Sequence, residues 1–311
     1  MKLIEQFEKK HKLDYKENTL INYKINMKEF LDFAREYLKV GEEVDDVELI
    51  QKVDWGCCME FRNHLHSLGL VETSINRKLS AMRTLFKFAM SSRYIKENPS
   101  IEVGNLSTSH IMPSNDYLTE EELSKLLKTI LTRYSGAKYF DFISKRDMFL
   151  YLLLATSGVR IHEALALKEE HFNFEDNEVM IIGKGGKFRV APIDDLVKEW
   201  YNRYMAERTL LEVQHLIKKG NEEYIFLSPQ GTQLTTRASN FNLVKYCKRA
   251  NIKVISNHAL RHTFATIQME RGTHQNVISD MLGHSSVATT SRYMHTRREV
   301  MHKNVGVNIK F

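Results

Sequence analysis

The chain has 311 residues, of which 42% are hydrophobic and 27% are charged, a composition typical of a globular protein with a sizeable core. It contains no run of about 18 apolar residues, and its first 18 residues include acidic side chains and no apolar stretch, so we expect neither a membrane span nor a secretion signal. The formal net charge of +6 fits a solvated lysine-rich surface, but it also favours an anionic partner, nucleic acid first.

The N-terminal third is predicted to be helical. In segment 19–38, apolar residues recur at the 3.6-residue period of an amphipathic helix. A second helix is expected in 71–95, with a core side formed by Ile75, Leu79, Met82, Phe86 and Met90. The other side of this helix is either a solvated surface or a surface that enters the major groove of DNA. It carries the candidate DNA-binding residues, which are Asn76, Arg77, Lys78, Arg83 and Lys87.

A linker is predicted after this helix, because the apolar periodicity gives way there to Pro, Gly, Ser and Asn. Another helix begins near Tyr117, with Thr119 as its N-cap and acidic residues in its first turn. We therefore expect a helical domain at 1–104, a linker at 105–116 and a second domain at 117–311.

The second domain is predicted to be mostly helical, with one β-hairpin. Two short apolar strands, Val179–Ile182 and Phe188–Ala191, flank a turn that contains Gly185-Gly186. The expected fold class is therefore mainly α, in two domains, with a small antiparallel sheet in the second.

Six polar residues of the second domain are candidates for chemistry. Arg160 lies near the start of a helix, and Glu163 is placed one turn on, where it could orient the guanidinium. Lys184 lies in the turn of the hairpin, and His258 and Arg261 share a face of a helix that begins near Ser256. The remaining two are in "LGHSSVATTSRYMH", where a histidine follows a helix-ending glycine and a tyrosine comes nine residues later; they are His284 and Tyr293.

Each candidate also has an ordinary structural explanation. Arg160 could simply pair with its neighbouring glutamate, Lys184 could be an exposed turn lysine, and His258 could cap its helix. Arg261 could be a surface residue, His284 a histidine without a special role, and Tyr293 a half-buried tyrosine.

As a set, however, the six residues suit a phosphodiester. Guanidinium groups match the non-bridging phosphate oxygens bidentately and stabilise the charge that develops during attack. A tyrosine hydroxyl, whose pKa is about 10 when free, needs cationic neighbours or a base to attack near neutral pH. A lysine on the hairpin could protonate the departing deoxyribose oxygen.

Other catalytic and metal-binding patterns are missing or incomplete. The sequence has no G-x-x-x-x-G-K-[ST] phosphate loop and no G-x-S-x-G motif. His258 and His262 are four residues apart but lack the glutamate of H-E-x-x-H, and no acidic cluster suits Mg²⁺. The three cysteines show no metal-binding spacing and suit a reducing cytosol, so we expect a cytoplasmic protein; they are Cys57, Cys58 and Cys247.

Four motifs resemble those of the tyrosine recombinases, the integrase family of site-specific DNA recombinases, in family order and in an Xer-like layout. They are "SGVRIHEALAL", "IIGKGGKFRVAPI", "HALRHTFAT" and "MLGHSSVATTSRYMH". In addition, "TSINRKLSAMRTLFKFAMSSRYIKENP" resembles the helix that ends the family's core-binding domain. The resemblance covers nearly the whole chain.

This resemblance implies a site-specific recombinase with a SAM-like core-binding domain and a catalytic domain that form a C-shaped clamp around DNA. Tyr293 would be the nucleophile, Arg160 and Arg261 would hold the phosphate, Lys184 would be the general acid, and the two histidines would assist; they are His258 and His284. It also implies short inverted core sites as substrate and a homotetrameric synapse, with no cofactor, no ATP and no metal.

Two alternatives remain open at this point. A type IB topoisomerase uses similar residues to relax DNA, and a non-catalytic regulator would keep the clamp without the chemistry.

The C-terminal tail, from about residue 300 to 311, shows strict apolar alternation from Val305 to Phe311, which is typical of a strand. A frayed terminus is the alternative. Because members of the resembled family pass a C-terminal segment to the neighbouring protomer, the resemblance implies that Val305 to Phe311 dock there.

Overall fold

The computed structural model describes residues 3–107, 116–132, 139–183, 188–213 and 216–283. Contacts within it divide the chain into two units, residues 1–113 and 114–311. Among the helices in the described ranges, none has the length and apolar character needed to cross a membrane.

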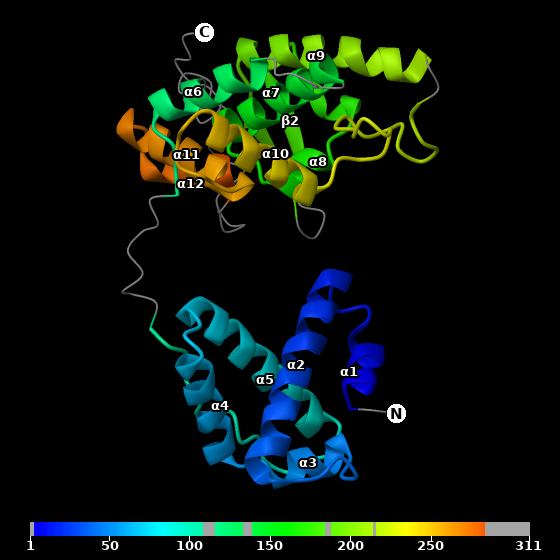
Figure 1. Cartoon of the computed structure of the whole chain (residues 1–311), viewed down its shortest axis with the longest axis vertical. Helices are drawn as coiled ribbons and strands as arrows, with labels where there is room; N and C mark the ends of the chain where they lie inside the picture. Colours follow the sequence, from blue (N-terminus) through cyan, green and yellow to red (C-terminus); the bar gives the residue numbers. More distant parts are fainter. Residues whose placement is uncertain (1–2, 108–115, 133–138, 184–187, 214–215, 284–311) are drawn as a thin grey trace, which may run out of the picture. The chain divides into compact units, whose positions relative to one another are not determined.

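The first unit consists of helices around one apolar core (Figure 1). The long helix α2 packs against α1, α3, α4 and α5, so its apolar stripe is enclosed. The stripe predicted within 19–38 is buried or partly buried in α2, as expected for an amphipathic helix. The helices are α1 (Leu3–His11), α2 (Glu17–Leu38), α3 (Asp46–Lys52), α4 (Trp55–Ser67) and α5 (Glu72–Ser91).

One predicted core residue of α5 was wrong. Ile75 and Phe86 are fully buried as expected, but Met90 is 43% exposed and Ala89 takes the core position instead. Four turns of an α-helix advance about 14.4 residues, so the stripe that begins at residue 75 reaches the core again near residue 89.

The second unit is built around α7, whose side chains are almost all buried from Phe142 to Ser157. Helices α6, α9 and α11 pack against it. Thr119 caps α6 through a capping box with Glu122, which confirms the predicted start of that helix. The helices are α6 (Glu120–Leu131), α7 (Phe140–Ser157), α8 (Ile161–Leu165), a 3-10 turn (Glu169–His171), α9 (Asp195–Val213), α10 (Thr236–Arg249), α11 (Asn257–Glu270) and α12 (Gln275–Leu282).

A buried ion pair ties α7 to its surroundings. Arg146 pairs with Asp147 at 2.7 Å and donates to the Leu227 carbonyl at 2.9 Å. The Asp147 carboxylate also accepts from Asn242 and Tyr246 of α10. These contacts satisfy charges that would otherwise be costly to bury.

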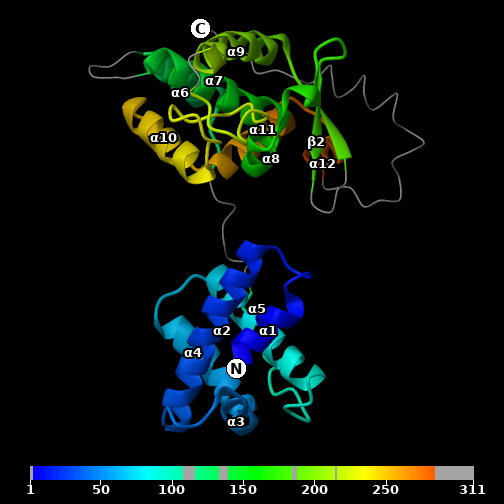
Figure 2. The ribbon, with the colours of Figure 1, turned by 90° about the vertical axis from the view of Figure 1, so that its right-hand side faces the viewer.

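The sheet is a three-stranded antiparallel meander, with strand order β1-β2-β3. The predicted hairpin is confirmed: β2 (Glu178–Ile182) pairs with β3 (Phe188–Pro192) in a register that sets Met180 opposite Val190. Strand β1 (Phe172–Asn173) was not predicted, because two residues are too few to show a period. Helix α8 packs against β2 and α12 against β3, so both helices lie beside the hairpin (Figure 2).

Candidate active site

Arg160 lies in the tight connection between α7 and α8. Helix α7 ends at Ser157 and is capped by Gly158, which has a left-handed φ of 64°, and Arg160 occupies the N-cap position of α8. Glu163 accepts from the Arg160 backbone N–H at 2.9 Å and from its guanidinium at 3.0 Å, which confirms the predicted contact. The Arg160 side chain remains 32% exposed while that of Glu163 is 4% exposed, so a buried carboxylate orients an accessible cation.

Arg261 holds two helix ends together. It lies on α11 and donates to the Gly158 carbonyl at 2.7 Å and to the Leu282 carbonyl at 2.6 Å, and these atoms end α7 and α12 respectively. Burial, together with the charges of Arg160 and Arg189, lowers the pKa of Arg261 to about 10. The structure therefore brings Arg160 and Arg261 into one electrostatic cluster.

His258 lies at the surface of α11, one turn before Arg261. Partial burial lowers its pKa below the ordinary value, and the charges of His262, Arg261 and Arg160 add to that effect. The His258 and His262 rings are 4.7 Å apart in an edge-to-face arrangement. The imidazole of His258 is therefore held neutral at neutral pH, a form in which it can both donate and accept.

Arg189 of β3 is part of this cluster and was missed in the sequence. Its guanidinium donates to Glu163 Oε2 at 2.6 Å, and a second nitrogen lies 3.5 Å from the Met281 carbonyl. Burial raises the pKa of Glu163, but the Arg160 N–H bond and the charges of Arg189 and Arg160 outweigh it, so the net pKa is lowered. A signal existed: strand alternation places Arg189 on the same face as the buried Ala191.

The other three predicted catalytic residues lie outside the described residues; they are Lys184, His284 and Tyr293. The same holds for the C-terminal tail. The elements that precede Lys184 and His284 are described: β2 ends at Ile182 and α12 ends at Leu282. The predicted helix-ending glycine is confirmed, because Gly283 follows α12 with a φ of 72°.

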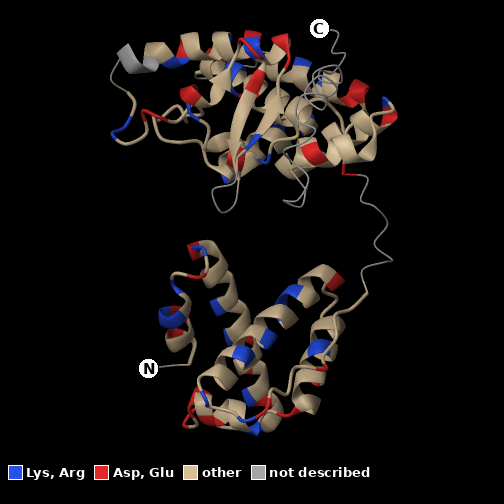
Figure 3. Ribbon diagram, turned by 180° about the vertical axis from the view of Figure 1, so that it is seen from behind, with Lys and Arg blue, Asp and Glu red and all other residues tan. Residues whose placement is uncertain are grey.

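The predicted DNA-binding face of α5 is largely engaged within the chain. Asn76 exchanges two hydrogen bonds with the backbone of Leu106, and Arg83 donates to the Val103 carbonyl and to Asn105. Lys78 pairs with Glu29 of α2. The two remaining residues of this face are exposed, and they are Arg77 and Lys87. Lys and Arg residues are spread over several helices of the first unit (Figure 3).

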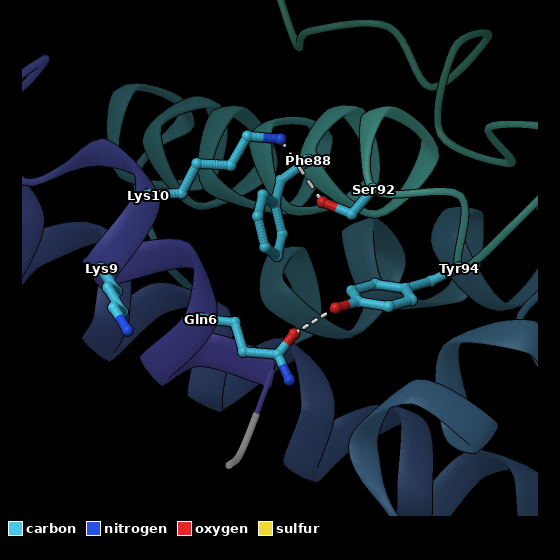
Figure 4. A pocket seen from close by; sticks show the side chains of 6 residues that line it. All are labelled: Gln6, Lys9, Lys10, Phe88, Ser92 and Tyr94. Carbon is cyan, nitrogen blue, oxygen red and sulfur yellow. Dashed lines mark hydrogen bonds between the residues drawn. The ribbon is translucent and has the colours of Figure 1, made fainter.

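An open pocket between α1 and the end of α5 contains none of the predicted catalytic residues (Figure 4). The Lys10 ammonium donates to Ser91 and Ser92, and the Tyr94 hydroxyl donates to Gln6. The residues that line the pocket are Gln6, Lys9, Lys10, Phe88, Ser92 and Tyr94.

Among the described residues, no three His, Cys, Asp or Glu side chains are grouped as a metal site requires.

Both units match models of known protein families. The model of the phage integrase family matches residues 116–299, and that of the phage integrase SAM-like domain matches residues 1–103. The chain belongs to the phage integrase family. Its relatives include the tyrosine recombinase XerC of Staphylococcus saprophyticus, 29% identical over 93% of this chain and 90% of XerC. The tyrosine recombinase XerD of Chlorobaculum tepidum is 33% identical over 78% of this chain and 77% of XerD.

Solved structures of recombinases share the fold. The XerH site-specific recombinase bound to a palindromic difH substrate has a TM-score of 0.66 at 21% identity, over 91% of this chain and 75% of XerH. The Tn1549 transposon integrase has a TM-score of 0.63 at 19% identity, over 92% of this chain and 93% of the integrase chain. The solved structures confirm the predicted fold class. The family model and the relatives confirm the predicted family, and the chain is a tyrosine site-specific recombinase.

Proposed function

We propose that this recombinase cuts DNA by attack of Tyr293 on a scissile phosphate held by Arg160 and Arg261. The tyrosine hydroxyl passes its proton to an imidazole of the site, that of His258 or His284, and its oxygen forms a bond to phosphorus, while the bond from phosphorus to the 5′ oxygen breaks. The product is a 3′-phosphotyrosyl link and a free 5′-hydroxyl, and Lys184 supplies the proton that this hydroxyl gains. Reversal with a 5′-hydroxyl from a second site rejoins the DNA, so the step consumes no ATP.

The cationic cluster is the observation that carries this proposal. The guanidinium groups of Arg160 and Arg189 both donate to the Glu163 carboxylate, and Arg261 interacts with it through charge. Burial, and after it the charges of Arg160 and Arg189, lower the pKa of Arg261, and three cations face a single anion in this partly buried setting. A phosphodiester that gains charge during attack would relieve the repulsion among these cations, and fixed donors aimed at such charge usually contribute the largest catalytic term.

The remaining roles follow the family motifs. The neutral imidazole of His258 is suited to a hydrogen bond with a phosphate oxygen, and His284 would act beside it. Residues 1–104 would form the core-binding domain and 117–311 the catalytic domain, joined by 105–116. The substrate would be duplex DNA with short inverted core sites, bound by a homotetramer; solved neighbours include XerH on difH and a lambda integrase dimer on a core site.

Trapping of the covalent intermediate tests the proposal. Short inverted repeats about one helical turn apart are sought in the DNA beside the gene and built into nicked substrates. Wild-type protein and the control Tyr37→Phe, which alters an exposed tyrosine of α2, should give a protein-linked DNA band in a denaturing gel. Tyr293→Phe should bind the same site and give no band.

Three results would overturn the proposal. A band from Tyr293→Phe would mean that the nucleophile is another residue. A bound but uncleaved substrate with the wild type would favour the non-catalytic regulator. Relaxation of supercoiled plasmid without any exchange between two sites would favour the topoisomerase.

A modified leaving group tests Lys184 separately. Lys184→Ala should slow cleavage by roughly 10² to 10⁴, the usual contribution of a general acid. Sulfur at the 5′-bridging position leaves more readily than oxygen, so it should restore most of the lost rate. Lys187→Ala serves as the control on the same hairpin, and an unrestored rate would assign Lys184 a role other than proton donation.

A further inference from the structure

We propose that Arg189 is a positioning residue of this reaction, which couples the turn that carries Arg160 to the C-terminal end of α12. The inference rests on the proposed function, because it concerns how the phosphate-binding arginine is held. Arg189 lies outside the six residues assigned from the motifs.

The contact with Glu163 links Arg189 to Arg160. One oxygen of the Glu163 carboxylate, Oε1, accepts from the Arg160 guanidinium. The other, Oε2, accepts from both the Arg160 backbone N–H and Arg189. Charge-assisted hydrogen bonds of this kind are stronger and more directional than neutral ones. Arg189 therefore fixes the plane of the carboxylate that orients Arg160.

The second contact links Arg189 to α12. Its guanidinium approaches the Met281 carbonyl, one of the last carbonyls of the helix, while Arg261 binds the neighbouring Leu282 carbonyl. The C-terminal end of a helix carries partial negative charge and unpaired carbonyls, so two cations stabilise it. The sequence reaches the proposed catalytic His284 two residues after Leu282.

Gly283 shows how closely the arginine approaches this helix end. A Cβ atom at Gly283 would lie 2.6 Å from Arg189 Cδ and 2.8 Å from Arg189 Nε. The backbone there is left-handed, and Arg189 passes over a residue that has no side chain. With 15% of its side chain exposed, Arg189 is packed among three elements: β3, α8 and α12.

This arrangement predicts a defect in catalysis more than in binding. Without Arg189, the Glu163 carboxylate loses a strong donor and can rotate, so Arg160 loses its orientation toward the phosphate. Misplacement of a catalytic group by about 1 Å can lower the rate roughly 10²-fold. The electrostatic attraction of DNA for the whole protein changes by only one charge.

The experiment measures single-turnover cleavage of the nicked core site at saturating protein, together with Kd and Tm. Arg189→Met should lower the cleavage rate by about 10- to 100-fold and change Kd by less than about 3-fold. Arg189→Lys should give an intermediate rate, because a single ammonium cannot replace the two-pronged contact. The matched control is Arg203→Met, which removes an exposed arginine paired with Glu199 on α9.

Two further readouts separate positioning from a general loss of stability. In Glu163→Gln, the partner of Arg189 is already neutral, so adding Arg189→Met should cost much less than it does in the wild type. The pH profile should also change. Arg160, Arg189 and Arg261 are the charged groups that face Glu163, and removing one of them raises the Glu163 pKa. Cleavage by Arg189→Met should therefore fall off at a higher pH as the solution is acidified.

A wild-type cleavage rate in Arg189→Met, or full additivity with Glu163→Gln, would overturn the inference. If Arg189→Met does not fold at the assay temperature, Arg189→Lys decides, and a wild-type rate and pH profile in that variant would refute it. Failure of the wild type itself to form the covalent adduct would instead overturn the proposed function.

Discussion

Replacement of Gly158 by alanine should destabilise the second unit and loosen Arg261 at the same time. Gly158 has a φ of 64°, and a Cβ atom there would lie 2.6 Å from Phe264 Cδ1 and 2.8 Å from Leu282 Cδ2. Both neighbours belong to a small cluster in which α11 packs against α12. The added methyl group would thus push these helices apart at the point where the Gly158 carbonyl receives Arg261.

The size of this effect follows from two contributions. A left-handed backbone costs a non-glycine residue about 1–2 kcal/mol, and overpacking of a filled core costs about 1–3 kcal/mol more. Gly272 provides a matched control, because its φ is 78° but a Cβ there would meet nothing within 4 Å. Gly158→Ala should therefore be less stable than Gly272→Ala by about 1–3 kcal/mol, since the backbone contributions cancel.

The assay is urea unfolding followed by tryptophan fluorescence. The chain has two tryptophans, Trp55 in the first unit and the buried Trp200 in the second. In a Trp55→Phe background, the signal reports the second unit alone. Gly158→Ala should also lower the rate of DNA cleavage, whereas Gly272→Ala should not. Equal unfolding free energies for the two variants would refute the argument that Phe264 and Leu282 close on Gly158.

Four other predictions are open to test. His262→Ala should raise the pKa of His258 in an NMR titration, because it removes a neighbouring charge that lowers that pKa. His66→Ala is the control, and an unchanged His258 pKa would mean that His262 does not act on it. Arg77→Ala with Lys87→Ala should flatten the log–log salt dependence of DNA binding by about 0.9 for each phosphate that is no longer neutralised, and an unchanged slope would move the DNA footprint off α5. Arg146→Met should destabilise the protein by about 3–5 kcal/mol, because it leaves the buried charge of Asp147 without its cationic partner. Lys125→Met breaks only an exposed pair and should change nothing measurable, so equal stability of these two variants would contradict the role of the buried pair. Truncation after Lys303 should leave single-site binding intact and slow strand exchange; recombination at the wild-type rate would refute docking of the tail on a neighbouring protomer.

The sequence predicted best where the controlling interactions are local. The contact between Arg160 and Glu163 spans three residues of one helix start, so spacing alone was enough to find it. Arg189 depends on β3, α8 and α12 meeting, and its partners are 26 and 92 positions away along the chain. Periodicity within one element does not reveal contacts between elements that are far apart along the chain. A charged residue on the buried side of a strand was nevertheless a usable sign.

Helix α5 shows the limit of an amphipathic pattern. Apart from Met90, the pattern correctly separated an apolar side from a polar side, but it could not tell which polar residues face the chain itself. Asn76 and Arg83 bind the segment around Val103 to Leu106, and Lys78 binds α2. Whether a polar face meets solvent, DNA or another part of the same chain depends on tertiary packing, which periodicity does not contain.

Two arginines hold helix ends through backbone oxygens. Arg261 binds the carbonyls of Gly158 and Leu282, at the ends of α7 and α12, and Arg189 contacts that of Met281 in α12. Every amino acid has such an oxygen, so most substitutions along α12 leave the acceptors in place. Divergence of the α12 sequence between two relatives is therefore a poor measure of divergence in how their sites are held. A designer who wishes to alter the outer surface of α12 has wide freedom, provided that the two arginines and the two helix-ending glycines are kept.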